Sequence, residues 1–161
     1  MKIIDNKLLL LFIAILFSCN VCGAKYQFDY EIESAGTGAN GTYLVKVCVI
    51  ANKPSPNTEY IKKCAIHGVL FRGFANKELR SSQKPLAGSA LTEQQYADFF
   101  SIFFDDGGIY KNYANFVNTD FEIIKVGKKE YRITAILTIA KDQLYNDLVK
   151  ANIIKGLNRG F

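Results

Sequence analysis

The chain has 161 residues, of which 49% are hydrophobic and 22% are charged, and its formal net charge is +5 at pH 7. This composition excludes an intrinsically disordered or collagen-like chain, and the length suits one domain better than two. A chain of about this size buries roughly two-thirds of its unfolded surface and therefore needs no metal or disulfide to fold. We predict no cofactor.

The N-terminal segment has the features of an export signal. Lys2 and Lys7 precede an apolar run over residues 8–17 that no polar residue interrupts. The run is too short for a transmembrane helix, which needs about 20 residues, and it fits the hydrophobic region of a signal peptide, about 7–15 residues. We therefore expect an exported protein, located in the periplasm, in the outer membrane or at the cell surface.

Two cleavage sites are compatible with this segment. The small residues of the Cys22-Gly23-Ala24 stretch suit an ordinary signal peptidase that cuts before Lys25. Residues 16–19 (LFSC) instead resemble a bacterial lipoprotein signal, in which the cysteine, here Cys19, is lipidated and becomes the first residue. The two alternatives are a signal peptide over 1–24, or over 1–18 with lipidated Cys19, followed by a single α+β domain over 25–161.

Alternating apolar and polar residues predict two strands at the start of this domain. Residues 26–33 and 42–51 each alternate with a period of two, and the turn-rich segment 36–41 separates them. We expect a hairpin in which Val47 faces the core and Cys48 faces the opposite side. The two cysteines of the domain, Cys48 and Cys64, are therefore expected to remain unpaired.

Three helices are predicted to follow the hairpin. The first covers residues 58–71 and starts near Asn57. The second starts at a capping box formed by Thr92 and Gln95 and buries Phe100 and Phe103, which have helical spacing. The third is short and covers residues 109–117.

Two connecting segments are notable. Residues 73–90 contain two glycines, one proline and three serines, which predicts a long loop. The Asp105-Asp106-Gly107-Gly108 stretch could bind calcium, but it lacks the alternating oxygen ligands of an EF-hand loop. We expect it to end the second helix.

The C-terminal part returns to strands. Residues 121–126 and 130–140 flank a short turn and predict a second hairpin, and a final helix follows over 142–151. The predicted order is therefore strand, strand, three helices, strand, strand, helix. It indicates an α+β fold with a four-stranded antiparallel sheet, built from two hairpins, and with helices packed on one face.

The other face of this sheet is expected to carry an apolar patch. By strand phase, the patch consists of Leu44, Cys48, Ile50, Ile124, Val126 and Ile136. Such a patch could cover another envelope protein or a second copy of the chain, or loop segments could bury it. Basic residues are also frequent in the C-terminal part, and they could contact an anionic membrane or wall surface. Export and the lack of a recognisable motif argue against nucleic acid as a partner.

Three sequence stretches resemble a known group of proteins. "CAIHGVLFRGF", "QKPL" and "FFDDGGIYKNY" are similar to an uncharacterised family of small exported bacterial proteins. The resemblance implies export and no established activity, so it assigns no functional residues. The order of the predicted elements also resembles small α+β envelope modules that assist larger assemblies, which is an analogy of fold alone.

The residues suited to chemistry are few. His67 is the only histidine and lies one helical turn after Cys64, so the two could in principle form a base and a nucleophile. A structural zinc site needs four ligands, which this pair cannot supply, and we predict no metal site. Glu31, Glu33 and Glu122 could pair as glycosidase carboxylates only across a cleft, and we expect them on the solvated face of the sheet.

The sequence therefore favours a non-enzymatic binding or assembly module of a bacterial envelope. The alternative is a small periplasmic enzyme of hydrolase type, with a site near His67 and the 73–90 loop. The two differ in one testable respect, since an enzyme should hold His67 in a concave pocket beside other polar groups.

Overall fold

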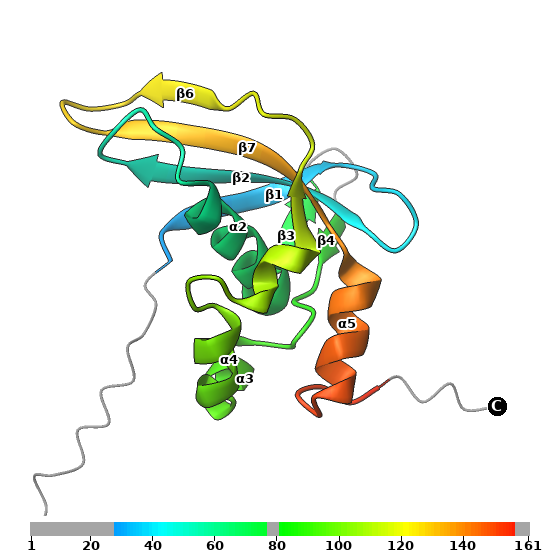
Figure 1. The fold of residues 1–161 in the computed structure, drawn as a ribbon. Helices are drawn as coiled ribbons and strands as arrows, with labels where there is room; N and C mark the ends of the chain where they lie inside the picture. Colours follow the sequence, from blue (N-terminus) through cyan, green and yellow to red (C-terminus); the bar gives the residue numbers. More distant parts are fainter. Residues whose placement is uncertain (1–27, 77–80, 157–161) are drawn as a thin grey trace, which may run out of the picture.

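A computed structural model describes residues 28–76 and 81–156 of the chain (Figure 1). The predicted signal segment, the candidate lipidation site Cys19 and the start of the predicted first strand lie outside the described residues. The elements that follow all belong to the predicted α+β domain.

The described residues form an α+β fold. In chain order, the elements are β1 (Tyr30–Gly36), β2 (Tyr43–Ala51), α2 (Thr58–His67), the π-helix η1 (Gly68–Arg72), β3 (Phe74–Asn76), β4 (Ser81–Gln83), α3 (Ala90–Gln95), α4 (Ala97–Phe103), the 3₁₀-helix η2 (Ile109–Tyr113), β5 (Ala114–Phe116), β6 (Glu122–Lys125), β7 (Tyr131–Ile139) and α5 (Lys141–Lys150).

All strands belong to one seven-stranded sheet. The order is β4-β3-β1-β2-β7-β5, and β6 also pairs with β7. The two predicted hairpins are present as the antiparallel pairs β1·β2 and β6·β7, and nine antiparallel pairs join β2 to β7. The predicted four-stranded antiparallel sheet was wrong in detail, because three short strands extend it and β3 pairs with β1 in parallel. The helices lie on one side of the sheet (Figure 1).

The predicted strand phase is confirmed. In β2, Val45, Val47 and Val49 are buried, whereas Cys48 between them is only partly buried. Successive side chains of a strand point to opposite faces, so this alternation separates a face that the helices cover from an open face. In β7, the buried positions are Ile133, Ala135, Leu137 and Ile139.

Helix α2 starts where the sequence predicted. The side chain of Asn57 accepts a hydrogen bond from the backbone N–H of Tyr60, at 3.0 Å, and caps the helix. The helix continues into η1 through Gly68, where the chain approaches β1 closely. A Cβ atom at Gly68 would lie 2.7 Å from Cδ1 of Ile32, so only glycine fits this contact without a shift of the neighbouring side chain.

The predicted 73–90 loop is not a continuous loop. β3 and β4 pair with each other inside it, and β3 also pairs with β1. The backbone N–H groups of Leu86 and Ala87 then donate to the carbonyls of Val69 and Leu70 in η1. Three-residue strands have too few residues to show an alternating pattern, so no sequence pattern indicated this pairing.

The predicted capping box at Thr92 is wrong. The N-cap is three residues earlier, at Ser89, which accepts a hydrogen bond from the N–H of Leu91 at 3.2 Å, and the helix begins at Ala90. The predicted helix is also interrupted, since Tyr96 departs from helical geometry (φ −115°, ψ 36°) and separates α3 from α4. Ser89 is an equally good cap by residue type.

From α4 to β5, some predictions are confirmed and others are wrong. Phe100 and Phe103 are buried in the core, as predicted, at 3% and 2% exposure. α4 ends before the Asp105–Gly108 stretch, and Gly107 adopts a positive φ of 87°. The predicted third helix is instead a 3₁₀-helix followed by β5, because residues 114–116 pair with the free edge of β7.

Candidate functional site

His67 lies at the end of α2 and is buried, with 7% of its surface exposed. Its Nδ1 atom lies 2.6 Å from the hydroxyl oxygen of Tyr30 in β1, and its Nε2 atom lies 3.4 Å from Oε1 of Glu93 in α3. The rings of Phe28, Phe71 and Phe104 surround the imidazole at centroid distances of 4.5 to 6.2 Å. Both nitrogens of the only histidine therefore have polar partners inside an aromatic cluster.

Cys64 does not join this group. Its side chain is fully buried, and burial raises the pKa of the thiol to about 12, although a hydrogen bond with Tyr60 opposes the increase. A cysteine acts as a nucleophile through its thiolate, which such a pKa excludes at neutral pH. The structure thus brings His67 together with Tyr30 and Glu93, whereas Cys64 contacts Tyr60. Both cysteines of the described chain are unpaired, as predicted.

The open face of the sheet has a regular arrangement of side chains. Strand pairing aligns them in rows across β1, β2, β7 and β6, and side chains within a row are direct neighbours. One row consists of Glu31, Cys48, Thr134 and Glu122. The adjacent row consists of Ile50, Arg132 and Ile124, and a third row contains Glu33, Lys46 and Ile136.

Large apolar side chains are exposed on this face, as the strand phase predicted. The exposed members of the predicted patch are Ile50 (46%), Ile124 (47%), Val126 (50%) and Ile136 (36%). Arg132 separates the first two, since it is paired with Ile50 on one side and with Ile124 on the other. An arginine between two exposed isoleucines is a composition typical of protein interfaces.

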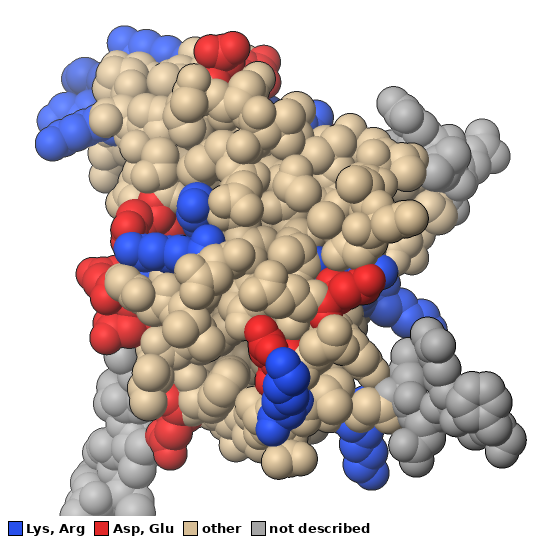
Figure 2. Space-filling view, turned by 45° about the vertical axis from the view of Figure 1, so that its right-hand side comes forward, with Lys and Arg blue, Asp and Glu red and all other residues tan. Residues whose placement is uncertain are grey.

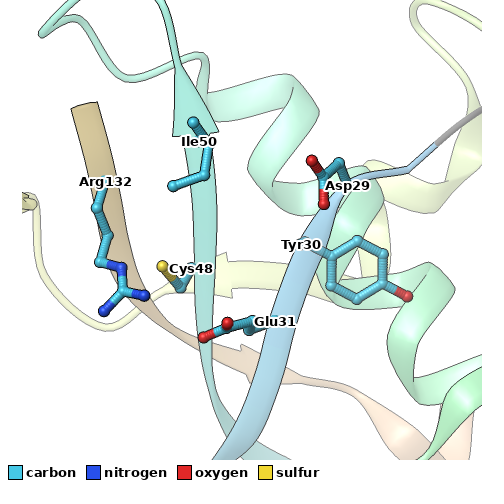
Figure 3. A pocket seen from close by; sticks show the side chains of 6 residues that line it. All are labelled: Asp29, Tyr30, Glu31, Cys48, Ile50 and Arg132. Atoms are coloured by element: carbon cyan, nitrogen blue, oxygen red, sulfur yellow. The ribbon is translucent and has the colours of Figure 1, made fainter. Parts of the chain in front are cut away.

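A shallow cavity of about 60 Å³ lies within the first two rows (Figure 3). Cys48 lies at its centre, between Glu31 on β1 and Arg132 on β7, as Figure 3 shows. Partial burial raises the pKa of the Cys48 thiol, while a hydrogen bond with Thr134 and the nearby charge of Arg132 oppose the increase. The cavity is large enough for one small side chain or a few waters and too small for a drug-sized ligand.

Some charged side chains of this open face form ion pairs with each other, and others do not. Glu33 forms an ion pair with Lys46. Among the described residues, the guanidinium of Arg132 has no carboxylate within the 4.0 Å of an ion pair. Glu31 and Glu122 are separated by two intervening strands, or about 14 Å of sheet, which exceeds the carboxylate spacing of about 5–9.5 Å in glycosidases.

Basic residues are concentrated at one end of the sheet. Lys125, Lys128 and Lys129 are exposed at the turn that joins β6 to β7, and lysines and arginines are gathered at the upper left of Figure 2, over this hairpin. A buried basic residue that the sequence did not predict is Lys63 in α2. Its Nζ atom lies 2.8 Å from Oδ1 of Asp106 and 5.5 Å from the centroid of the Tyr110 ring.

A second cavity, of about 170 Å³, lies between α4, η2 and α5. Its lining is mainly apolar and includes Phe99, Phe103, Leu144 and Leu148, together with the acidic Asp147. His67 lines neither of the two cavities described here. No group of three or more His, Cys, Asp or Glu side chains within residues 28–76 and 81–156 is arranged to hold a metal ion.

No helix in the described part of the chain has both the length and the apolar character needed to cross a membrane. Comparisons of the chain with protein-family models, with curated proteins and with solved structures yield no match.

Proposed function

We propose that this protein is a non-enzymatic binding module of a bacterial envelope, and that the open face of its sheet docks a partner protein. The observation that carries the proposal is the row in which Arg132 lies between the exposed side chains of Ile50 and Ile124. Burial of the two isoleucines would contribute about 25 cal/mol per Å² of apolar surface removed from water.

The same row specifies the chemistry of the partner. Arg132 has no ion-pair partner among the described residues, so a carboxylate of the partner would offset the cost of burying its charge in a complex. A guanidinium binds a carboxylate through two parallel hydrogen bonds, which fixes orientation as well as adding affinity. The partner is therefore a protein segment that carries an aspartate or glutamate between apolar side chains.

The alternative of a small hydrolase with a site at His67 has no comparable support. Tyr30 and Glu93 occupy both nitrogens of His67, and the ring is buried among phenylalanines. A general base has to reach a substrate proton within about 2.6–3.2 Å or through one water. The segment that follows β4, in the predicted 73–90 loop, is hydrogen-bonded to η1 and does not form a wall of either cavity.

Site-specific photo-crosslinking tests the docking surface. A benzophenone amino acid replaces Ile50 on the open face or, as a control, Ile102, which is 77% exposed on α4. We expect a protein adduct at position 50 in envelope fractions, and we expect Arg132→Glu to reduce its yield several-fold. Lys84→Glu, an equal charge change at an exposed position near β4, should leave the yield unchanged. Equal adducts at positions 50 and 102, or no effect of Arg132→Glu, would contradict the proposal.

Export is a separate part of the proposal, and the intact mass of the protein from the envelope tests it. A chain that starts at Lys25 identifies an ordinary secreted protein, and a diacylglycerol mass on Cys19 identifies a lipoprotein. A full-length soluble chain that is found only in the cytoplasm would contradict both.

A further inference from the structure

Strand β6 has one paired edge and one edge that no described strand covers. It pairs with β7 from Glu122↔Thr134 to Lys125↔Tyr131, and it is the outermost strand at its end of the sheet (Figure 1). At the other end of the sheet, where β4 is the outermost strand, other segments cover the outer edge of β1. There β3 pairs with β1, and Arg72 donates hydrogen bonds to the carbonyls of Phe28 and Tyr30 at 3.1 and 3.2 Å.

The backbone of β6 offers hydrogen-bonding groups at its open edge. The N–H of Val126 donates to the carbonyl of Glu130 at 2.9 Å, so these two residues form a hydrogen-bonded pair of the hairpin. Hydrogen-bonded and non-hydrogen-bonded pairs alternate along an antiparallel ladder. Ile124 and Glu122 therefore direct their N–H and C=O groups toward β7, and Ile123 and Lys125 direct theirs outward.

Apolar side chains are exposed along this edge beside the charged Glu122 and Lys125. Ile123, Ile124 and Val126 have exposed fractions of 39%, 47% and 50%. An exposed apolar edge strand with unpaired backbone groups is a template for another strand, and native proteins usually protect such edges. Other segments cover the outer edge of β1, whereas no described segment covers the outer edge of β6, so the backbone groups of β6 are available to another strand.

The charges along β6 specify which strand would pair with it. Asp120 and Glu122 lie at its N-terminal end, and Lys125, Lys128 and Lys129 lie at its C-terminal end. A parallel second copy would place like charges side by side, which is destabilising. An antiparallel second copy would place the acidic end of each strand beside the basic end of the other.

We propose that two copies of this chain form a dimer in which their β6 strands pair antiparallel about a two-fold axis. Residues that pair across the interface have to lie on the same face of the joint sheet. The axis therefore lies midway between the two copies of one residue, so that this residue pairs with itself. An axis at Ile124 places Asp120, just before β6 in one copy, beside the turn that carries Lys128 in the other. It also pairs Ile123 of each copy with Lys125 of the other, and these are the residues whose backbone groups face outward.

This arrangement goes beyond the proposed function and does not rest on it. The two-fold axis is perpendicular to the sheet, so the open faces of both copies lie on the same side. The Ile50–Arg132–Ile124 rows of the two copies then join into one continuous row across the interface. Such an isologous dimer, with the same surface contributed by both subunits, is the commonest oligomer among soluble proteins.

Cysteine crosslinking tests the pairing in cells that express the full chain. In a Cys48→Ser background, Ile124→Cys places two thiols on the axis, at a non-hydrogen-bonded pair where Cα atoms lie about 4.5 Å apart, within the range for a disulfide. We expect diamide to produce several-fold more covalent dimer than in the Cys48→Ser chain alone. Ile136→Cys is the matched control, because it lies on the same face in β7 and its mate would lie far beyond the roughly 7 Å limit.

Charge reversal provides a second and independent test. Asp120→Lys should reduce the yield of the Ile124→Cys dimer several-fold, and the added change Lys128→Asp should restore it. Within one chain Asp120 precedes β6 and Lys128 lies in the turn that follows it, at opposite ends of the strand, so only pairing between two copies explains a rescue. Equal yields at positions 124 and 136, or a loss that Lys128→Asp does not restore, would overturn the dimer. Neither result would affect the photo-crosslinking at Ile50, which reports on the docking surface alone.

Discussion

The hydroxyl oxygen of Tyr30 and Nδ1 of His67 lie 2.6 Å apart at a buried contact between β1 and the end of α2. Glu93 approaches the other ring nitrogen from α3, so one imidazole connects three elements that are distant in the sequence. Buried polar groups are stable only when they are hydrogen-bonded. The arrangement therefore gives His67 a structural role in aligning the helices with the sheet.

Removing the Tyr30 hydroxyl should destabilise the fold. Tyr30→Phe keeps the ring but leaves Nδ1 of His67 buried without a partner, which typically costs about 1–3 kcal/mol. Urea unfolding of the purified variant measures the change. Tyr96→Phe is the control and should cost less, because its hydroxyl donates to the carbonyl of Asn152 at an exposed position, where water can replace it. Equal stability of Tyr30→Phe and the wild type would contradict the structural role of His67.

The aromatic side chains of α4 should be essential for stability. Phe100→Ala and Phe103→Ala each remove a buried ring, and such changes typically cost about 3–5 kcal/mol. Ile102→Ala on the same helix is the control, since 77% of the Ile102 surface is exposed and little should be lost. Thermal unfolding of the three variants provides the measurement. If both phenylalanine variants melt with the wild type, the placement of α4 against the core is wrong.

Gly73 should tolerate no side chain. It adopts a φ of +70°, and a Cβ atom there would lie 2.3 Å from the carbonyl oxygen of Gln83 in β4. Gly73→Ala therefore combines backbone strain, about 1–2 kcal/mol, with a clash against the backbone. Gly107→Ala separates the two effects, because φ is +87° and nothing lies within 4 Å. Denaturant unfolding should show a clearly larger loss at Gly73, and equal losses would mean that β3 and β4 do not pair as described.

The two thiols should differ in reactivity. Cys48 is partly exposed on the open face and Cys64 is fully buried. Iodoacetamide at pH 8 should therefore label Cys48 in the native protein, and Cys64 only after unfolding in urea without reductant. Peptide mass mapping identifies the labelled residue. Labelling of neither residue in unreduced urea would mean that a disulfide joins them, which would contradict the assignment of the strand faces.

Alkaline pH should destabilise the protein. Burial raises the pKa of Cys64, Tyr110 and Tyr113 to about 12 each, whereas in an unfolded chain a thiol titrates near about 8.5 and a tyrosine near about 10. Between these values the unfolded state releases protons that the folded state retains. This stabilisation is complete below about pH 8.5 and is lost progressively as the pH rises toward about 12.

Urea unfolding between pH 8 and pH 11 measures this loss. The Cys64→Ala variant should lose less stability than the wild type between pH 8.5 and 10, where the thiol contributes more to the loss than any one tyrosine. Cys48→Ala is the control and should keep most of the wild-type slope, because the Cys48 thiol is only partly buried. A constant free energy of unfolding up to pH 11 would show that these groups are not buried in solution.

The parts of the fold that were predictable from the sequence are those with a long periodic pattern. Alternation of apolar and polar residues indicates both hairpins and the outward direction of Cys48. Residue type indicates the start of α2 near Asn57, and helical spacing indicates the burial of Phe100 and Phe103. β3, β4 and β5 have three residues each and form because β1 and β7 offer edges to them. Edges of this kind exist only in the folded molecule.

The same distinction holds for the candidate site. Strand phase placed Ile50, Ile124 and Arg132 on the open face, but only the register of β2, β7 and β6 shows that they form one row. The sequence suggested a pair of Cys64 and His67 from their spacing. The actual partners of His67 come from β1 and α3, and no local pattern connects them.

The pairing of β2 with β7 has a consequence for the order of folding. It joins Tyr43 to Ile139 and Ala51 to Tyr131, so the two hairpins meet only after all the intervening helices have been synthesised. Each hairpin alone is marginally stable in water, and contacts between residues so distant in sequence form slowly. The sheet therefore cannot be completed until nearly the whole chain has left the ribosome. For a protein that is exported, as we propose, this delay would keep the chain unfolded until translation is nearly complete.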